Sequence, residues 1–279
     1  MAFIDLQTLI IVGLAFAMGG VLKGATGVGA PLIAVPVMTS FVDIRFAVAV
    51  FVVPNLVTNL IQSIIYRRAL TNRLFLLILC LSSGLGAFVG SLTLYKTSGG
   101  VLEMVMAWLV LFYVGFRLYK PNSQLSMPVA HKLNMPMGFL AGFLQGAFGI
   151  SAPATLTFLN AIKFERTEFI IIVSVFFMTM SLIQLPTLYY LGLMQAEHLI
   201  FGLLAVIPLM GFMPLGAFFL RYSSPKIFDK MILVILLILK HIIFLKHAST
   251  RWFLCIYIFF TSDVLVCSRL SQQTLYWTR

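Results

Sequence analysis

The sequence predicts an all-α polytopic membrane protein made of two inverted repeats, each a Gly-broken helical hairpin followed by three transmembrane helices. Three observations predict this fold class. Hydrophobic residues make up 61% of the 279 residues and charged residues 10%, whereas soluble domains contain roughly 45–50% apolar residues. A gap-free offset of 122 residues aligns the two halves of the chain. Basic residues also gather in alternate loops, which favours a defined orientation in a bilayer.

The first repeat, at residues 1–120, begins with an apolar stretch at 8–39. A Gly-rich motif within it, GVLKGATGVGAP at 20–31, interrupts the helical pattern. Such breaks occur in membranes only where protein or a polar cavity satisfies the freed backbone groups. Apolar runs near the ~20 residues that span a bilayer follow the motif. They predict transmembrane helices at 46–66, 74–95 and 101–119.

A predicted cytoplasmic linker at 121–135 leads to the second repeat at 136–246. Its apolar stretch, at 136–162, carries GFLQGAFGISAP at 142–153, which is identical to the first motif at 7 of 12 positions. The three following spans are predicted at 168–190, 197–220 and 227–246. The tail at 247–279 has no counterpart in the first repeat, and it either adds one span or lies at the membrane interface.

Loop charge indicates whether each motif stretch crosses the bilayer once or turns back as a hairpin. With two hairpins, one side holds 11 basic loop residues, namely Arg67, Arg68, Arg73, Arg117, Lys120, Lys132, Lys163, Arg166, Arg221, Lys226 and Lys230. The other side holds Arg45 and Lys96. With single crossings the same residues divide 6 against 7, and the positive-inside rule gives no preference. Hairpins are therefore favoured, and they invert the second repeat relative to the first.

The distribution of charge bears on the class of function. Although the formal net charge is +11, the basic residues lie between apolar runs and leave no stripe for nucleic acid. All 8 acidic residues lie at predicted helix ends, in loops or in the tail, and the 4 histidines and 3 cysteines show no metal-ligand spacing. The sequence therefore predicts no catalytic residue, no metal site and no cofactor, which argues against an enzyme.

The two Gly-rich breaks are the candidate substrate site. Amide N–H groups at a helix start attract anions. The candidate residues are Gly24, Thr26, Gly27, Gly29 and Pro31 in the first break, and Gly146, Gly149, Ser151 and Pro153 in the second. We expect both tips to converge near the bilayer midplane and to offer backbone donors and hydroxyls, including that of Thr155, to a compact oxyanion. The alternative is that the glycines only let helices pack closely.

Lys23, Gln62 and Gln184 complete the candidate substrate-binding set. Lys23 is the only charged residue in either motif, and its equivalent is the neutral Gln145. Its ammonium either counters an anionic substrate or snorkels to the interface. The matched Gln62 and Gln184 either line the substrate path or form hydrogen bonds between helices.

At the duplicated motif the sequence resembles the sulfite exporter TauE/SafE family, over residues 8 to about 240. Members carry a G-x-x-x-G-x-x-G-x-G-type segment near the start of each half. The matching positions here are Gly20, Gly24, Gly27 and Gly29, then Gly142, Gly146 and Gly149. Ser151 stands where the family pattern has a further glycine. The resemblance implies movement of small sulfur-containing anions, such as sulfite or organosulfonates, across the bacterial cytoplasmic membrane.

We therefore expect a multi-pass secondary transporter that works by alternating access, with a small anionic solute and the lipid bilayer as its partners. Coupling to H⁺ or Na⁺ and association as a homodimer stay open at this point. The alternatives are a passive anion channel and a non-transporting accessory or assembly protein of the membrane.

Overall fold

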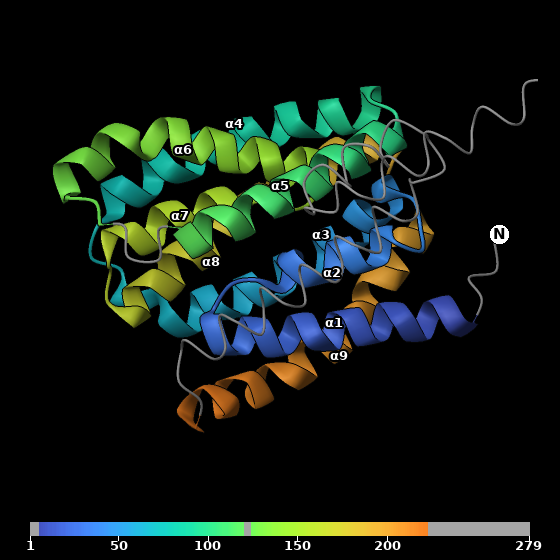
Figure 1. The fold of residues 1–279 in the computed structure, drawn as a ribbon, viewed down its shortest axis with the longest axis horizontal. Coiled ribbons are helices and arrows are strands. Elements are labelled where there is room, and N and C mark those ends of the chain that lie inside the picture. Colours follow the sequence, from blue (N-terminus) through green and yellow to red (C-terminus); the bar gives the residue numbers. More distant parts are fainter. Residues whose placement is uncertain (1–5, 120–123, 223–279) are drawn as a thin grey trace, which may run out of the picture.

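The protein is a set of α-helices packed side by side (Figure 1). The computed structural model describes residues 6–119 and 124–222, and these residues contain no strand. The helices are α1 (Leu6–Thr26), α2 (Ala30–Thr39), α3 (Ile44–Tyr66), α4 (Arg73–Lys96), α5 (Gly99–Tyr119), α6 (Met127–Phe148), α7 (Ala152–Ile162), α8 (Arg166–Tyr190) and α9 (Ala196–Tyr222), with a 3-10 turn η1 (Arg67–Ala69) between α3 and α4. The predicted span at 227–246 and the tail at 247–279 lie outside the described residues.

Five of the described helices, α1, α3, α4, α8 and α9, are long and apolar enough to cross a membrane. The last four confirm the spans predicted at 46–66, 74–95, 168–190 and 197–220, with ends that differ by at most 2 residues. α5 matches the prediction at 101–119 equally well. The chain is thus a multi-pass, all-α membrane protein.

Side chains around α4 are arranged as the bilayer requires. Leu77, Leu81 and Leu85, one turn apart, are 55%, 67% and 58% exposed, whereas Ser83 and Gly86 on the other face are buried. Lipid tails solvate leucine as well as a protein core does, so small residues rather than large apolar ones gather where helices meet. The face of α4 that carries Ser83 and Gly86 packs against α6.

Local sequence sets several helix ends. Asp43 caps α3 by accepting a hydrogen bond from the Arg45 N–H (2.8 Å), and Asn72 caps α4 by accepting from the Phe75 N–H (3.1 Å). α6 begins at Met127, nine residues before the apolar stretch predicted at 136–162. Its first turns contain polar residues, so an apolar run does not predict helix there. One of them, Asn134, donates to the buried carbonyl oxygen of Phe75 (2.7 Å).

Both motif stretches turn back on themselves. In the first repeat, Ala30 at the start of α2 lies beside the middle of α1, with its carbonyl oxygen 3.2 Å from the place a Cβ would take on Gly19. In the second repeat, the Leu125 N–H before α6 donates to the Ala161 carbonyl oxygen near the end of α7 (2.7 Å). In each repeat the helix after the break thus lies against the helix before it.

The motif helix of each repeat packs against the fourth helix of the other repeat: α1 lies along α9, and α6 lies along α4 (Figure 1). Close backbone approaches include those of Gly20 with Leu209, Gly24 with Met213, Gly142 with Ser83, and Gly146 with Ala87. Residue numbers rise together along each pair, so both pairs run parallel. Each repeat thus packs its motif helix on the fourth helix of the other repeat.

α3 and α8 form the central contact between the repeats. The Asn55 Nδ2 donates to the Ser181 hydroxyl (2.9 Å), and the Ser174 hydroxyl donates to Gln62 Oε1 (3.3 Å). As residue numbers rise on α3 they fall on α8, so these two helices run antiparallel. Interhelical hydrogen bonds of this kind contribute on the order of 1 kcal/mol each in membranes.

Candidate functional site

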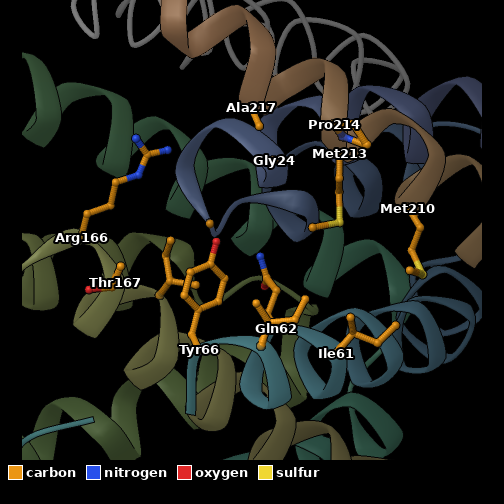
Figure 2. A pocket seen from close by; sticks show the side chains of 13 residues that line it. Gly24, Ile61, Gln62, Tyr66, Arg166, Thr167, Met210, Met213, Pro214 and Ala217 are labelled. Atoms are coloured by element: carbon orange, nitrogen blue, oxygen red, sulfur yellow. The ribbon is translucent and has the colours of Figure 1, made fainter. Parts of the chain in front are cut away.

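A cavity of about 580 Å³ lies beside the first Gly-rich break (Figure 2). Its walls come from the end of α1, the second half of α3, the start of α8 and the second half of α9. The lining residues are Gly24, Gly27, Ile61, Gln62, Ile65, Tyr66, Arg166, Thr167, Ile170, Met210, Met213, Pro214 and Ala217. Small-molecule sites usually enclose about 300–1,000 Å³, so a small anion fits here together with water.

The polar groups of this cavity suit a negative charge. Gln62, Tyr66, Arg166 and Thr167 supply amide, hydroxyl and guanidinium donors, and none of the described lining residues is acidic. The Arg166 Nη2 reaches the end of α1, where it donates to the Ala25 carbonyl oxygen at 3.5 Å. This long contact leaves most of the guanidinium donors for other acceptors.

Two glycines of the first break adopt backbone conformations that disfavour a side chain. Gly27 has a φ of 78° and Gly29 a φ of 115°, a backbone region that glycine adopts without steric cost. Gly29 precedes α2, and its equivalent in the second repeat, Ser151, has a φ of −101°. The backbone conformation at Ser151 is open to any residue, which explains why a serine can stand where the family pattern has glycine.

The remaining candidates of the first break hold the break together. The Thr26 hydroxyl lies 2.8 Å from the Leu22 carbonyl oxygen, also contacts that of Val28, and accepts from the Val28 N–H at 3.2 Å. Pro31 is buried in the first turn of α2. Gly24 lines the cavity and also packs against α9, where a Cβ would lie 1.9 Å from the Met213 carbonyl oxygen. Close packing and cavity lining thus coexist at Gly24.

Lys23 is enclosed by protein rather than extended to the interface. It is 2% exposed, and its ammonium donates to Asn59 Oδ1 at 2.7 Å. Asn59 in turn donates to Asn55 Oδ1 (2.8 Å), and Asn55 donates to Ser181 on α8. The burial excludes the snorkelling alternative. Lys23 precedes the cavity-lining Gly24 in the chain, and the neutral side chains of Asn59 and Asn55 join its amine to the second repeat.

Gln62 belongs to the cavity as well as to the contact between the repeats. Its Oε1 accepts from Ser174, and its side chain points toward the break at Gly24 (Figure 2). It is 7% exposed. Both alternatives considered for this residue, lining a path and bonding between helices, are therefore compatible with its position.

The second break is more tightly enclosed. The Gln184 Nε2 donates to the carbonyl oxygens of Gln145 (3.3 Å) and Gly146 (3.4 Å), and the Ser151 hydroxyl donates to Gln145 Oε1 (3.1 Å). Gly149 ends α6 with a φ of 70°. The backbone of Pro153 lies in the first turn of α7. None of these residues lines the cavity beside the first break.

The two breaks nevertheless make equivalent contacts with the opposite repeat. A Cβ on Gly27 would lie 2.9 Å from Cγ1 of Ile170 on α8, and one on Gly149 would lie 3.1 Å from Cγ2 of Val48 on α3. Val48 and Ile170 are themselves 122 residues apart. The structure thus groups Gly24, Gly27 and Gln62 around one cavity, and Gly146, Ser151 and Gln184 in one hydrogen-bonded cluster.

Three polar residues of the cavity, Tyr66, Arg166 and Thr167, were not predicted as site residues. Arg166 was counted only as a loop charge. It directly follows Glu165, which matches Asp43 at the 122-residue offset, so the helix start could be predicted. The packing of this helix start beneath the end of α1 is tertiary, and the sequence carries no signal for it.

Within residues 6–119 and 124–222, no group of three or more His, Cys, Asp or Glu side chains lies together in a way that could hold a metal ion. The donors around the cavity are an amide, two hydroxyls and a guanidinium. They can bind and orient an anion.

A family model described as sulfite exporter TauE/SafE matches residues 11–240 of the chain. Comparison with curated proteins and with solved structures gives no match. The family match covers both Gly-rich breaks and the whole cavity, and it confirms the resemblance carried by the duplicated motif.

Proposed function

Because the chain belongs to the sulfite exporter TauE/SafE family, we propose that it is a secondary transporter that moves sulfite or another small sulfur oxyanion across the cytoplasmic membrane of a bacterium. Family membership suggests a membrane exporter of sulfite or a related anion. Together with the apolar helices, it indicates a transport protein rather than an enzyme.

The observation that carries the proposal is the cavity beside the first break. It combines the Arg166 guanidinium with the Gln62 amide, and Gly24 and Gly27 form part of its wall. Lys23, which precedes Gly24 in α1, is buried and donates to the neutral Asn59 on α3. A guanidinium in a cavity whose described lining residues include no acidic side chain favours an anion, since charge-assisted hydrogen bonds are roughly twice as strong as neutral ones.

The contacts between the repeats support alternating access. The exchanged pairs α1 with α9 and α6 with α4, and the antiparallel contact of α3 with α8, support two inverted repeats around the centre of the protein. In this arrangement a cavity borders the first break while the equivalent residues of the second break are enclosed. Rocking one repeat against the other would exchange the open and the enclosed break.

The test is uptake and efflux of labelled sulfite, thiosulfate, sulfoacetate and taurine in proteoliposomes that contain the purified protein. Arg166→Gln should lower the rate for the transported anion by at least about tenfold, since a hydrogen bond to a charged group contributes about 1.5–3 kcal/mol. Arg68→Gln is the matched control, because Arg68 is exposed and lies outside the cavity. No flux of any of the four anions would contradict the proposal and favour an accessory protein of the membrane.

The same vesicles separate a carrier from a channel and identify the coupling ion. A carrier saturates with substrate, whereas a passive anion channel passes current without saturation at low concentration. Imposed H⁺ and Na⁺ gradients, applied one at a time, show which ion drives accumulation.

The inversion of the repeats has its own test, in which single cysteines replace Arg68 after α3 and Gln195 before α9. Both positions are exposed, and they lie in equivalent loops of the two repeats. A membrane-impermeant thiol reagent should label them from opposite sides. Labelling of both from the same side would rule out inverted repeats.

A further inference from the structure

Unpartnered polar atoms gather at the second break. Of the four buried side-chain atoms that find no hydrogen-bond partner among the described residues, three belong to this region: Gln145 Nε2, Thr155 Oγ1 and Gln184 Oε1. Gln145 and Gln184 have no exposed surface, and Thr155 is 2% exposed. A buried polar atom left unpaired costs about 1–3 kcal/mol, so three such atoms on residues around one break point to a polar ligand there.

The three residues belong to one hydrogen-bonded cluster. Gln184 is joined to the backbone of Gln145, and the Gln145 side chain is joined to the Ser151 hydroxyl. The Thr155 N–H donates to the Ser151 carbonyl oxygen at 2.9 Å, which fixes Thr155 one turn further along. The unpaired groups therefore surround the same break in the chain.

This cluster lies at the N-terminus of α7, a helix of 11 residues. Ser151 occupies the cap position, yet its side chain makes no capping hydrogen bond to α7, because its hydroxyl donates to Gln145 instead. The positive end of the helix dipole is thus available to an anion. The motif at 142–153 contains no charged residue.

We propose that the second break is a second binding position for the transported oxyanion, built from neutral groups, and that it takes the anion in a singly protonated form. Gln145 Nε2 and the Thr155 hydroxyl donate to the oxygens of the anion, together with the N-terminus of α7. Gln184 Oε1 accepts the hydrogen that a species such as hydrogensulfite still carries. The inference rests on the proposed function, which supplies the class of substrate.

The two positions then differ in charge at equivalent residues. The cavity at the first break is lined by the Arg166 guanidinium and its motif carries Lys23, whereas the equivalent Gln145 contributes a neutral amide to the second break. A dianion needs cationic groups to offset its loss of water, while a monoanion can be held by neutral donors and a helix dipole. A neutral second position therefore selects the monoanion.

Equilibrium binding of ³⁵S-sulfite to the purified, detergent-solubilised chain tests the second position. We expect two sites per chain in the wild type, one in Arg166→Gln, and none with measurable affinity in Arg166→Gln combined with Thr155→Val. Thr155→Ser should keep the site, because it keeps the hydroxyl. Thr157→Val is the matched control on the same helix, since Thr157 borders a separate apolar groove.

The outcomes are distinguishable. A single wild-type site that Arg166→Gln abolishes would overturn the second position and leave the proposed function standing. No binding by the folded wild-type protein would overturn both. The thermal unfolding temperature shows whether the variants fold. Thr155→Val removes an unpaired hydroxyl and should not lower this temperature, whereas removal of a purely structural hydroxyl would lower it.

Competition between anions tests whether the second position binds a protonated anion. The measurements use the Arg166→Gln variant, in which only the second position binds the label. At pH 6, sulfite should displace the label at least about tenfold better than methanesulfonate, whose sulfonate group carries no hydrogen; tenfold corresponds to about 1.4 kcal/mol. Gln184→Met keeps the side-chain length but removes the acceptor, and it should reduce this preference to below about threefold. Equal displacement by the two anions before the Gln184 change would contradict a protonated ligand.

Discussion

Replacing Gly24 by alanine tests the packing that forms the cavity wall. The added Cβ would lie 1.9 Å from the Met213 carbonyl oxygen and 2.8 Å from the Met213 Cα, and both are backbone atoms that cannot rotate away. α1 and α9 must therefore separate by about 1.5 Å, the difference between 1.9 Å and the 3.4 Å at which ordinary contact begins. Overpacking of this kind costs about 1–3 kcal/mol. The gain in helix propensity from glycine to alanine, about 0.5–1 kcal/mol, offsets part of that cost.

The measurement is the thermal unfolding temperature in detergent, with Gly13→Ala as the control. Gly13 lies on the same helix and has nothing within 4 Å of an added Cβ, so its alanine variant should be as stable as the wild type or more stable. Gly24→Ala should unfold about 2–12 °C below Gly13→Ala, because both variants gain the same helix propensity and each 1 kcal/mol of the roughly 1–3 kcal/mol overpacking cost corresponds to about 2–4 °C. Anion binding at the cavity should weaken as well. Equal unfolding temperatures for the two variants would refute the described packing of α1 on α9.

Two further predictions concern polar partners. Asn59→Leu leaves the buried Lys23 amine without the acceptor it has at 2.7 Å, so the free energy of unfolding should fall by about 1–3 kcal/mol; adding Lys23→Met should restore most of that loss, and a double variant no more stable than Asn59→Leu would contradict the contact. Asp43→Ala removes the cap of α3 and should cost about 1 kcal/mol of unfolding free energy. Glu165→Ala should cost less, because Glu165 makes no side-chain cap bond to α8, and equal losses in chemical denaturation would contradict this distinction.

Helix positions and breaks could be predicted because they depend on local composition. Apolar runs of bilayer length predict spans wherever the lipid dictates the composition, and paired glycine and proline mark the places where a helix stops. The start of α6 was missed because its first turns contact protein and contain polar residues such as Asn134. Hydropathy detects contact with lipid, and it does not detect contact with a neighbouring helix.

The site could be predicted in part. Gly24, Gly27 and Gln62 were expected and do share one cavity, whereas Arg166 was missed because its place under α1 is set by tertiary packing. Burial of Lys23 against Asn59 could not be predicted either, since a lysine near a helix end can equally extend to the interface. Convergence of the two tips on one substrate stays a prediction.

The exchange of partners between the repeats imposes an order on biosynthesis. α6 can pack on α4 soon after its synthesis. α1 can pack on α9 only later, because α9 begins about 170 residues after α1 ends. At about 5–20 residues per second, this wait lasts roughly 10–30 seconds. The cavity has walls from both α1 and α9, so it cannot exist before the ninth helix arrives. A partly synthesised chain in the membrane therefore lacks this cavity and cannot leak solute through it.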